Sequence, residues 1–414
     1  QSWFSKPGLQ RIFSLLNADG GEARVVGGAV RNALMGLPVG DIDMATTLPP
    51  QDVVERAKDA GIKAVPTGVD HGTVTLVVDG EGYEVTTLRR DVTTDGRHAE
   101  VAFGTDWKED AERRDLTINA LYADASGEVI DLIGGLADIE TKTVRFIGDA
   151  ATRIAEDHLR ILRFFRFFAY YGSGRPDADG LRASARAKDK LSTLSAERVW
   201  SEMKKLLSAD DPSRALLWMR QAGVLAQILP ETEKWGIDSI HGLVATEQAL
   251  GWKPDPMLRL ASIIPPDAER VAALSSRLRM SKNEAARLDQ WAKAPAVDPS
   301  LAETALDRLL YRQGVEGVKT RLKLALSSAR ADMSAGEAAM QKIAKLSTLL
   351  SRAEKFDKPS FPLSGADVLA AGLPPGPQVG EVLSELEAAW VDGNFAADRE
   401  TLLARLATKL QQRS

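Results

Sequence analysis

Short apolar runs separated by glycine-rich turns recur through the first 150 residues. Alternating apolar and polar positions predict strands, and apolar positions three and four residues apart predict helices. The strands expected on this basis are 23–26, 41–45, 73–78, 83–88 and 128–132. The helices expected are 29–35, 51–60 and 114–122. This part of the chain should therefore form a head with a mixed sheet and flanking helices.

Segment 89–105 interrupts this pattern. It shows no clear hydrophobic period and is rich in charged residues, Thr and Gly. A stretch without periodicity and with high polarity is typical of a loop. We therefore expect a mobile loop at these positions.

After Gly148 the strand signals mostly disappear, and the apolar residues fall at helical spacing. Ser195 stands where the cap of one such helix is expected. The fold class predicted is α+β, with an all-helical remainder behind the head. The expected domains are a catalytic head at 1–149, a helical neck at 150–206, a helical body at 207–330 and a helical tail at 331–414.

The composition is that of an ordinary globular protein, with 44% hydrophobic and 27% charged residues. The chain has no cysteine, which excludes a thiolate metal site or a cysteine nucleophile. Its four histidines, one of which is His71, are scattered and argue against a histidine-built metal site. No apolar run approaches the ~20 residues of a membrane span, and the N-terminal residues lack the pattern of a secretion signal. We expect a cytoplasmic protein without membrane contact; its protein partners are unknown from the sequence.

The net charge of −5 hides an uneven distribution. Between Arg145 and Lys205 there are 13 Arg and Lys against 8 Asp and Glu, a net charge of +5, so the remainder carries −10. A basic middle is compatible with a nucleic-acid track on an acidic protein. A solvated helix face explains the same pattern.

Two short motifs in the head carry candidate chemistry. Gly27 and Gly28 lie between a predicted strand and a predicted helix, where backbone amides can approach an anion, and Arg31 can add a phosphate contact. Asp41 and Asp43 stand one residue apart on an expected strand, so their side chains should share a face. Such carboxylates can hold Mg²⁺ against phosphate oxygens. Each motif alone can be a plain turn, and the spacing of a dinucleotide-binding fingerprint is absent.

Further motifs follow in a fixed order. They are the Arg-Arg-Asp motif within 112–120, a hinge-like segment at 130–138, the Glu-Asp-x-x-Arg motif within 156–163 and a last motif at 196–207. With the Gly-Gly turn and the paired aspartates, this order resembles the class II tRNA nucleotidyltransferases (CCA-adding enzymes) and their bacterial poly(A) polymerase relatives. The resemblance covers about the first half of the chain.

The resemblance implies roles for individual residues. Asp41 and Asp43 would bind two Mg²⁺ ions, and Glu84 matches the family's third acidic, catalytic position. The loop at 89–105 would help to switch specificity. The residues implied in nucleotide binding are Gly28, Arg31, Arg114, Asp115, Asn119, Asp157, Arg160, Arg163 and Arg166.

The segment 156–166 is predicted to be one helix, with Glu156, Arg160 and Arg163 on one face. Asp157 and Arg160 could then lie side by side. An Asp that accepts from an amine and an Arg that donates to a ring acceptor would accept cytosine and adenine and reject uracil and guanine. The alternative is an amphipathic helix with intrahelical ion pairs. The phenylalanines that follow, among them Phe167, are expected to be core.

The activity implied is template-independent addition of CCA to the 3′ end of tRNA from CTP and ATP, with Mg²⁺, releasing pyrophosphate. Three alternatives stay open. A poly(A) polymerase would use ATP alone, an A-adding enzyme would complete tRNA that ends in CC, and an RNA-binding protein could have lost catalysis. The lack of an Arg-rich stretch before Arg89 favours CCA addition over poly(A) synthesis, and the full-length loop at 89–105 argues against an enzyme that adds only two cytidines. His241 is followed by Gly242 rather than Asp, so no phosphohydrolase domain is expected.

Overall fold

The structure is a computed structural model that describes residues 2–68, 72–95, 98–233, 235–332 and 336–413. The chain divides into two compact units, Gln1–Pro230 and Glu231–Ser414. The domain boundaries expected at 149, 206 and 330 stay predictions. His71 lies outside the described residues.

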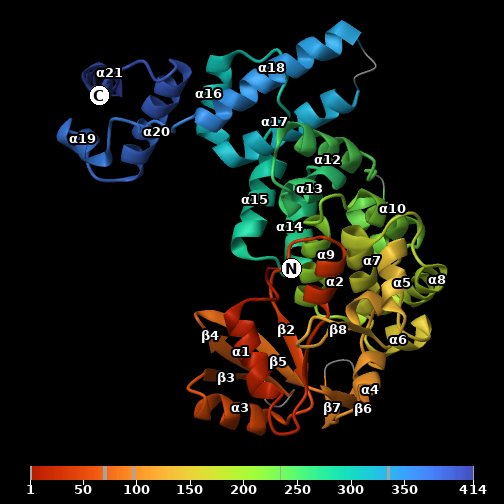
Figure 1. The fold of residues 1–414 in the computed structure, drawn as a ribbon. Helices are drawn as coiled ribbons and strands as arrows, with labels where there is room; N and C mark the ends of the chain where they lie inside the picture. Colours follow the sequence, from red (N-terminus) through yellow and green to blue (C-terminus); the bar gives the residue numbers. More distant parts are fainter. Residues whose placement is uncertain (1, 69–71, 96–97, 234, 333–335, 414) are drawn as a thin grey trace. The chain divides into compact units, whose positions relative to one another are not determined.

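A seven-stranded mixed sheet forms the centre of the first unit (Figure 1). Its strand order is β3-β4-β5-β2-β1-β8-β9, and all neighbours are antiparallel except the parallel pair β2 and β5. The strands are β1 (Ala23–Val26), β2 (Asp43–Thr46), β3 (Lys63–Gly68), β4 (Thr73–Val78), β5 (Glu81–Thr87), β8 (Leu121–Ala123) and β9 (Val129–Asp131). The five predicted strands are all present, although the second begins at Asp43 rather than at position 41.

The strand β4 shows why alternation predicts this sheet well. Val74, Leu76 and Val78 are buried, and the residues between them are half-exposed. One face of the strand packs into the core, so the period of two is visible in the sequence. The helices α1 (Pro7–Leu16) and α3 (Pro50–Asp59) pack against each other, and α3 also contacts β3 and β4.

The prediction of a loop at 89–105 is wrong. This segment forms an antiparallel two-stranded ribbon, β6 (Arg89–Asp95) and β7 (His98–Phe103), which is separate from the main sheet (Figure 1). Backbone pairing alone defines such a ribbon, and it does not have to bury one face. A hydrophobic period therefore need not accompany it.

The helix expected at 114–122 is also wrong. The chain here forms α4 (Trp107–Glu112), the short 3₁₀ turn η2 (Thr117–Asn119) and then β8. Asp106 caps α4, because its carboxylate accepts hydrogen bonds from the amides of Lys108 and Glu109. All residues of β8 are buried between β1 and β9, so the strand shows no alternation.

After the last strand of the sheet, the chain of the first unit continues as helices. The predicted helix at 156–166 is broken: α6 ends at Glu156 and α7 begins at Arg160. Asp157 has extended backbone angles and ends α6, and its carboxylate accepts from the amide of Leu159 in the turn that leads into α7. The other helices of this unit are α2 (Gly28–Leu34), α5 (Gly135–Thr141), α6 (Ala150–Glu156), α7 (Arg160–Tyr171), α8 (Ala178–Ala187), α9 (Ala196–Leu207), α10 (Ser213–Gln221) and α11 (Val224–Ile228), with the 3₁₀ turn η3 (Lys188–Thr193). The 3₁₀ turn η4 (Pro230–Thr232) begins at the last residue of this unit.

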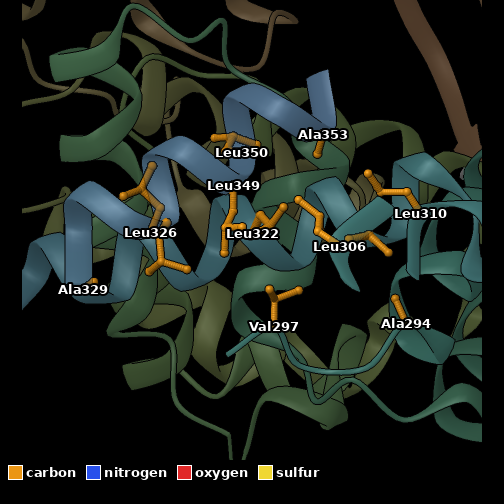
Figure 2. Close-up of a cluster of buried hydrophobic side chains, with 12 residues drawn as sticks. Ala294, Val297, Leu306, Leu310, Leu322, Leu326, Ala329, Leu349, Leu350 and Ala353 are labelled. Atoms are coloured by element: carbon orange, nitrogen blue, oxygen red, sulfur yellow. The ribbon is translucent and has the colours of Figure 1, made fainter. Parts of the chain in front are cut away.

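The second unit has no strand among its described residues. Leucines of three helices, including Leu306, Leu322 and Leu349, form its main core (Figure 2). A further core around Val368, Trp390 and others joins the last helices. The helices are α12 (Ser239–Leu250), α13 (Pro256–Ile263), α14 (Ala268–Arg277), α15 (Lys282–Lys293), α16 (Glu303–Gln313), α17 (Val315–Ala331), α18 (Gly336–Lys355), α19 (Gly365–Ala370), α20 (Pro377–Asp392) and α21 (Arg399–Arg413).

Candidate functional site

A pocket of about 600 Å³ in the first unit brings the chemistry-bearing residues together. Its size is that of a small-molecule site. All the predicted site residues except Asp41 and Arg166 line it. Those present are Gly28, Arg31, Asp43, Glu84, Arg114, Asp115, Asn119, Asp157, Arg160 and Arg163. The pocket thus has a small acidic part and several arginines.

Asp43 and Glu84 form the acidic part. They are register partners on the parallel strands β2 and β5, so both side chains project from the same face of the sheet. Burial raises the pKa of Asp43 above its ordinary value, and the negative charges of Glu84 and Asp41 raise it further. Asp41 precedes β2 and does not share the strand with Asp43, yet it lies close enough for its charge to act there.

The donor set of this acidic part fits a hard divalent cation. Its carboxylate oxygens are the ligands that Mg²⁺ prefers, and besides its burial, the negative charges of Glu84 and Asp41 act on Asp43. Among the residues that the structure describes, no group of three or more acidic or histidine side chains is already gathered in a metal-binding arrangement. The fit therefore rests on charge and ligand chemistry, with Asp43 and Glu84 as the residues that would hold the ion.

A tight turn places Arg31 beside the acidic part. Gly27 has a φ of +71°, which side chains other than glycine adopt only with strain. Arg31 is 6% exposed, and its N–H groups donate to Asn32, Asn119 and the Tyr171 hydroxyl. Its guanidinium also lies 3.9 Å from the centre of the Tyr171 ring.

None of these partners of Arg31 is a carboxylate. Burial lowers the pKa of Arg31, but the group remains a cation near neutral pH because its ordinary pKa is so high. A buried cation that only neutral groups orient is suited to an anionic ligand. Asn32 helps to orient this cation, because its side chain accepts from Arg31 and donates to the carbonyl of Pro38.

Asp110 fixes the two arginines of the Arg-Arg-Asp motif. It is 1% exposed and accepts hydrogen bonds from Arg113, Arg114 and the Tyr122 hydroxyl. Burial acts to raise the pKa of Asp110, but the two guanidinium groups and the hydrogen bonds outweigh it, so the pKa lies below its ordinary value. Among the described residues, Nη1 of Arg114 has no acceptor, so it can donate to a ligand in the pocket.

Asp110 was not singled out in the sequence. It stands three and four residues before the two arginines, a spacing that favours ion pairs on a helix and could have identified it.

The third residue of that motif, Asp115, joins the head to α7. Its carboxylate accepts from Nε of Arg163 at 2.7 Å, and it also accepts from Asn119. Burial acts to raise the pKa of Asp115, yet the charge of Arg163 and the hydrogen bonds hold it below its ordinary value. Arg166 instead pairs with the buried Glu202 and does not line the pocket.

At the α6–α7 junction, Asp157 and Arg160 line the pocket without pairing with each other. Asp157 accepts from Nη2 of Arg198 at 2.7 Å, and Arg160 pairs with Glu156 through Nη1. Within the described residues, Nη2 of Arg160 has no acceptor. Both side chains therefore keep hydrogen-bonding capacity toward the pocket.

Two aromatic residues and one arginine of this region were not predicted to belong to the site. Phe167 is buried as expected of core, but it also lines the pocket and lies under Arg166. Tyr171 orients Arg31, and no sequence pattern signals this contact across 140 residues. Arg198 falls inside the last motif, at 196–207, and orients Asp157.

Comparison with known proteins places this geometry in a family. Residues 23–145 match the family described as "Poly A polymerase head domain", and residues 177–235 match "Probable RNA and SrmB- binding site of polymerase A". The chain is 35% identical to CCA tRNA nucleotidyltransferase 1, mitochondrial, of Mus musculus, over 98% of this chain and 90% of the relative. It is 32% identical to the CCA-adding enzyme of Leuconostoc mesenteroides, over 95% and 94% of the two chains. The solved structure of the Bacillus stearothermophilus CCA-adding enzyme in complex with CTP has a TM-score of 0.71 at 28% identity and covers 98% of each chain.

Proposed function

The chain belongs to the family of CCA tRNA nucleotidyltransferases and poly(A) polymerases, and we propose that the pocket of its first unit is where the family's reaction takes place. The protein is a metal-dependent nucleotidyltransferase that adds CCA to the 3′ end of tRNA from CTP and ATP. The observation that supports this assignment to the pocket is the register pair Asp43 and Glu84 opposite the arginines of one cavity. A catalytically inactive RNA-binding protein would not need these side chains together.

The product can be tested with a tRNA transcript that lacks its last three residues, to which each labelled nucleotide is offered. We expect addition of C, C and A, followed by a stop, when CTP and ATP are both present. A gel that resolves single nucleotides measures this, with a transcript that already ends in CCA as the control. A long tail from ATP alone would show a poly(A) polymerase, and addition only to tRNA ending in CC would show an A-adding enzyme.

Mg²⁺ is the metal that we propose for the site. Such an ion lowers the pKa of the attacking 3′-hydroxyl and offsets the charge of the leaving pyrophosphate. Asp43 and Glu84 would hold it, with Asp41 contributing charge from just before β2. Arg31 and Arg114 face the same pocket and would bind the phosphates of the nucleotide.

Addition of Mg²⁺ to protein treated with EDTA should raise the midpoint of thermal unfolding. The ion binds the folded state and offsets both the burial of the Asp43 carboxylate and its repulsion by Glu84 and Asp41, which together raise its pKa. Because protons compete for a carboxylate with a raised pKa, more Mg²⁺ should be needed as the pH falls. Differential scanning fluorimetry measures both effects. An equal rise in the Glu84→Gln variant would contradict this metal site.

Tyr171 is proposed to position Arg31 for the triphosphate. Tyr171→Phe removes one hydrogen bond to the guanidinium and keeps the ring beneath it. We expect KM for CTP and ATP to rise several-fold, about the effect of one hydrogen bond, with kcat changed less. Steady-state kinetics with each nucleotide measure this.

Tyr170→Phe is the matched control for that variant. Tyr170 is the preceding residue of α7 and its hydroxyl donates to the carbonyl of Lys205. If both substitutions raise KM equally, the effect belongs to the helix and not to the contact between Tyr171 and Arg31.

Nucleobase selection is assigned to Asp157 and Arg160 in this proposal. Both line the pocket, and both retain free acceptor or donor positions toward it. The neck at 150–206, which contains both residues, would thus select the nucleobase, and the body at 207–330 and the tail at 331–414 would bind RNA. The match of 177–235 to a probable RNA-binding segment supports RNA contacts where neck and body meet in the sequence.

The site of action in the cell stays a prediction, cytoplasmic on the sequence alone. The relatives include a mitochondrial enzyme of mouse and bacterial enzymes. Across the described ranges, no helix has both the length and the apolar character that crossing a bilayer requires.

A further inference from the structure

A second pocket, of about 520 Å³, lies wholly within the second unit. The helices α12, α13, α15 and α17 contribute to its wall. Most of the wall is apolar or small, for example Ala261, Val297 and Ala325. Val297 also belongs to the main leucine core (Figure 2). The cavity is therefore continuous with the packed interior of this unit.

Close helix contacts and short side chains together explain why this pocket is not filled by the protein's own side chains. A Cβ on Gly317 would stand 2.3 Å from the carbonyl oxygen of Gln290, so α17 and α15 touch there through their backbones. A Cβ on Gly242 would stand 2.9 Å from Cβ of Ala331, so α12 and α17 also approach closely there. Between these contacts, Ala261 and Ala325 are too short to fill the volume.

One cation stands in this wall. Arg321 of α17 is half-buried, and its Nη2 donates to the carbonyl of Ala292 at 3.1 Å. Among the described residues it forms no ion pair with a carboxylate, and its buried Nε–H has no acceptor. Burial lowers the pKa of Arg321, although the group keeps its charge near neutral pH.

Beside this pocket, the indole of Trp291 is a second buried donor without an acceptor among the described residues. Its ring centre lies 5.5 Å from the guanidinium carbon of Arg321, and the residue is 2% exposed. Its Nε1–H is buried without an acceptor in the part of the chain that the structure describes. Within the described part of the chain, a positive charge without a carboxylate partner and two buried donors without acceptors therefore lie together beside this pocket, where an uncompensated charge is costly. The other polar residues of its wall are Asp238, Ser239, Ser262, Ser327 and Ser328.

We propose that this pocket binds a small organic anion, whose carboxylate or phosphate pairs with Arg321 and whose short apolar body packs against Ala261, Val297 and Ala325. Asp238, at the wall near Gly236, limits how much negative charge the ligand can carry. An RNA phosphate is less suited, because sites for nucleic-acid backbones use several basic residues. Arg321 is the single basic side chain among the described residues that line this pocket.

The test uses the full chain, with CTP present so that the pocket of the first unit is filled. Two fluorinated probes, 4-fluorobenzoate and 4-fluorophenyl phosphate, are titrated up to about 1 mM and followed by fluorine NMR. Comparing the two probes shows whether the pocket prefers a carboxylate or a phosphate. The neutral 4-fluorobenzyl alcohol tests whether the charge matters. We expect at least one anionic probe to bind, and the alcohol to bind at least ten-fold more weakly.

Three variants locate the binding. Arg321→Met should weaken binding at least ten-fold without lowering the unfolding temperature, because it removes a half-buried charge that has no carboxylate partner among the described residues and one hydrogen bond to a carbonyl. Ala325→Leu should abolish binding by filling the cavity. Arg405→Met, at an exposed position on α21 outside the pocket, should leave binding unchanged.

Four results would overturn the proposal: no binding of either anion, unchanged binding in Arg321→Met, equal binding of the alcohol, or loss of tRNA affinity in Arg321→Met without any probe binding. The last result would show that the cation contacts RNA phosphate. None of these results bears on the assignment of the CCA-adding reaction to the other pocket, which separate assays test.

Discussion

Asp43→Asn should reduce incorporation of CMP and AMP by about a thousandfold or more, while tRNA binding stays measurable. The substitution removes one negative charge from the only acidic register pair that lines the pocket among the described residues. Metal-ion stabilisation of a transition state is worth several kcal/mol, and each 1.36 kcal/mol is about tenfold in rate. Single-turnover kinetics at saturating nucleotide measure the chemical step directly.

The same variant should be at least as stable as the wild-type protein when no metal is present. Burial and the charges of Glu84 and Asp41 raise the pKa of Asp43, so the folded protein disfavours its ionised form. That penalty is absent at low pH and grows as the pH rises through the raised pKa, and the amide removes it. A strong loss of stability would mean that the rate effect comes from unfolding.

Asp52→Asn is the matched control for Asp43→Asn. Asp52 is exposed in the first turn of α3, in the same unit, and does not line the pocket. Its rate should equal that of the wild type. Retention of more than about a tenth of the activity in Asp43→Asn would contradict the metal-binding role, since a ligand contributes far more than one tenfold step.

The sheet could be predicted from the sequence where its strands bury one face. The alternation of β4 is an example, and its limits were predicted without error. The ribbon of β6 and β7 and the strand β8 lacked that signal, the first because it stands outside the main sheet and the second because all its residues are buried. A hydrophobic period reports one-sided burial and not strand formation itself.

The break between α6 and α7 had a different cause. The spacing of Glu156, Arg160 and Arg163 fits one helix, and Glu156 and Arg160 do form an ion pair. Local hydrogen bonding nevertheless interrupts the helix, because the Asp157 carboxylate accepts from the amide of Leu159 and α6 ends just before it. An aspartate in a helical pattern has both options, and the spacing of its neighbours does not distinguish them.

Most members of the pocket could be predicted, but their partners could not. Motif order located Asp115 and Arg163, whereas their ion pair joins positions 48 residues apart and depends on how α7 packs against the head. The same holds for Arg31 and Tyr171. Motifs therefore identify which side chains gather, and tertiary packing determines which of them remain available to a ligand.

Asp157 illustrates that point, since its availability to a base depends on Arg198. One carboxylate oxygen accepts from the amide of Leu159 and the other from Arg198, which fixes the carboxylate in one orientation at the pocket wall. Each oxygen has a second lone pair for an exocyclic amine. Nη2 of Arg160 supplies a donor beside it among the described residues. Cytosine and adenine present the matching amine and acceptor.

Asp157→Ala should therefore relax nucleotide choice while leaving catalysis in place. Loss of one base contact is worth about 1–3 kcal/mol, so the preference for CTP over UTP and for ATP over GTP should fall by about 5- to 150-fold. Competition between nucleotides on a tRNA transcript lacking CCA measures the ratio of kcat/KM values. Arg198→Ala should give a smaller change in the same direction, because it removes only the group that orients Asp157.

Asp157→Ser separates base recognition from the structural role of the residue. A serine can still accept from the amide of Leu159 and keep the turn between α6 and α7, but it offers no carboxylate. It should fold as well as the wild type and discriminate as poorly as Asp157→Ala. Asp179→Ala, an exposed acidic residue of α8, should change neither property. If Asp157→Ser discriminates like the wild type, the carboxylate serves only the α6–α7 junction, and base selection must come from other side chains of the pocket.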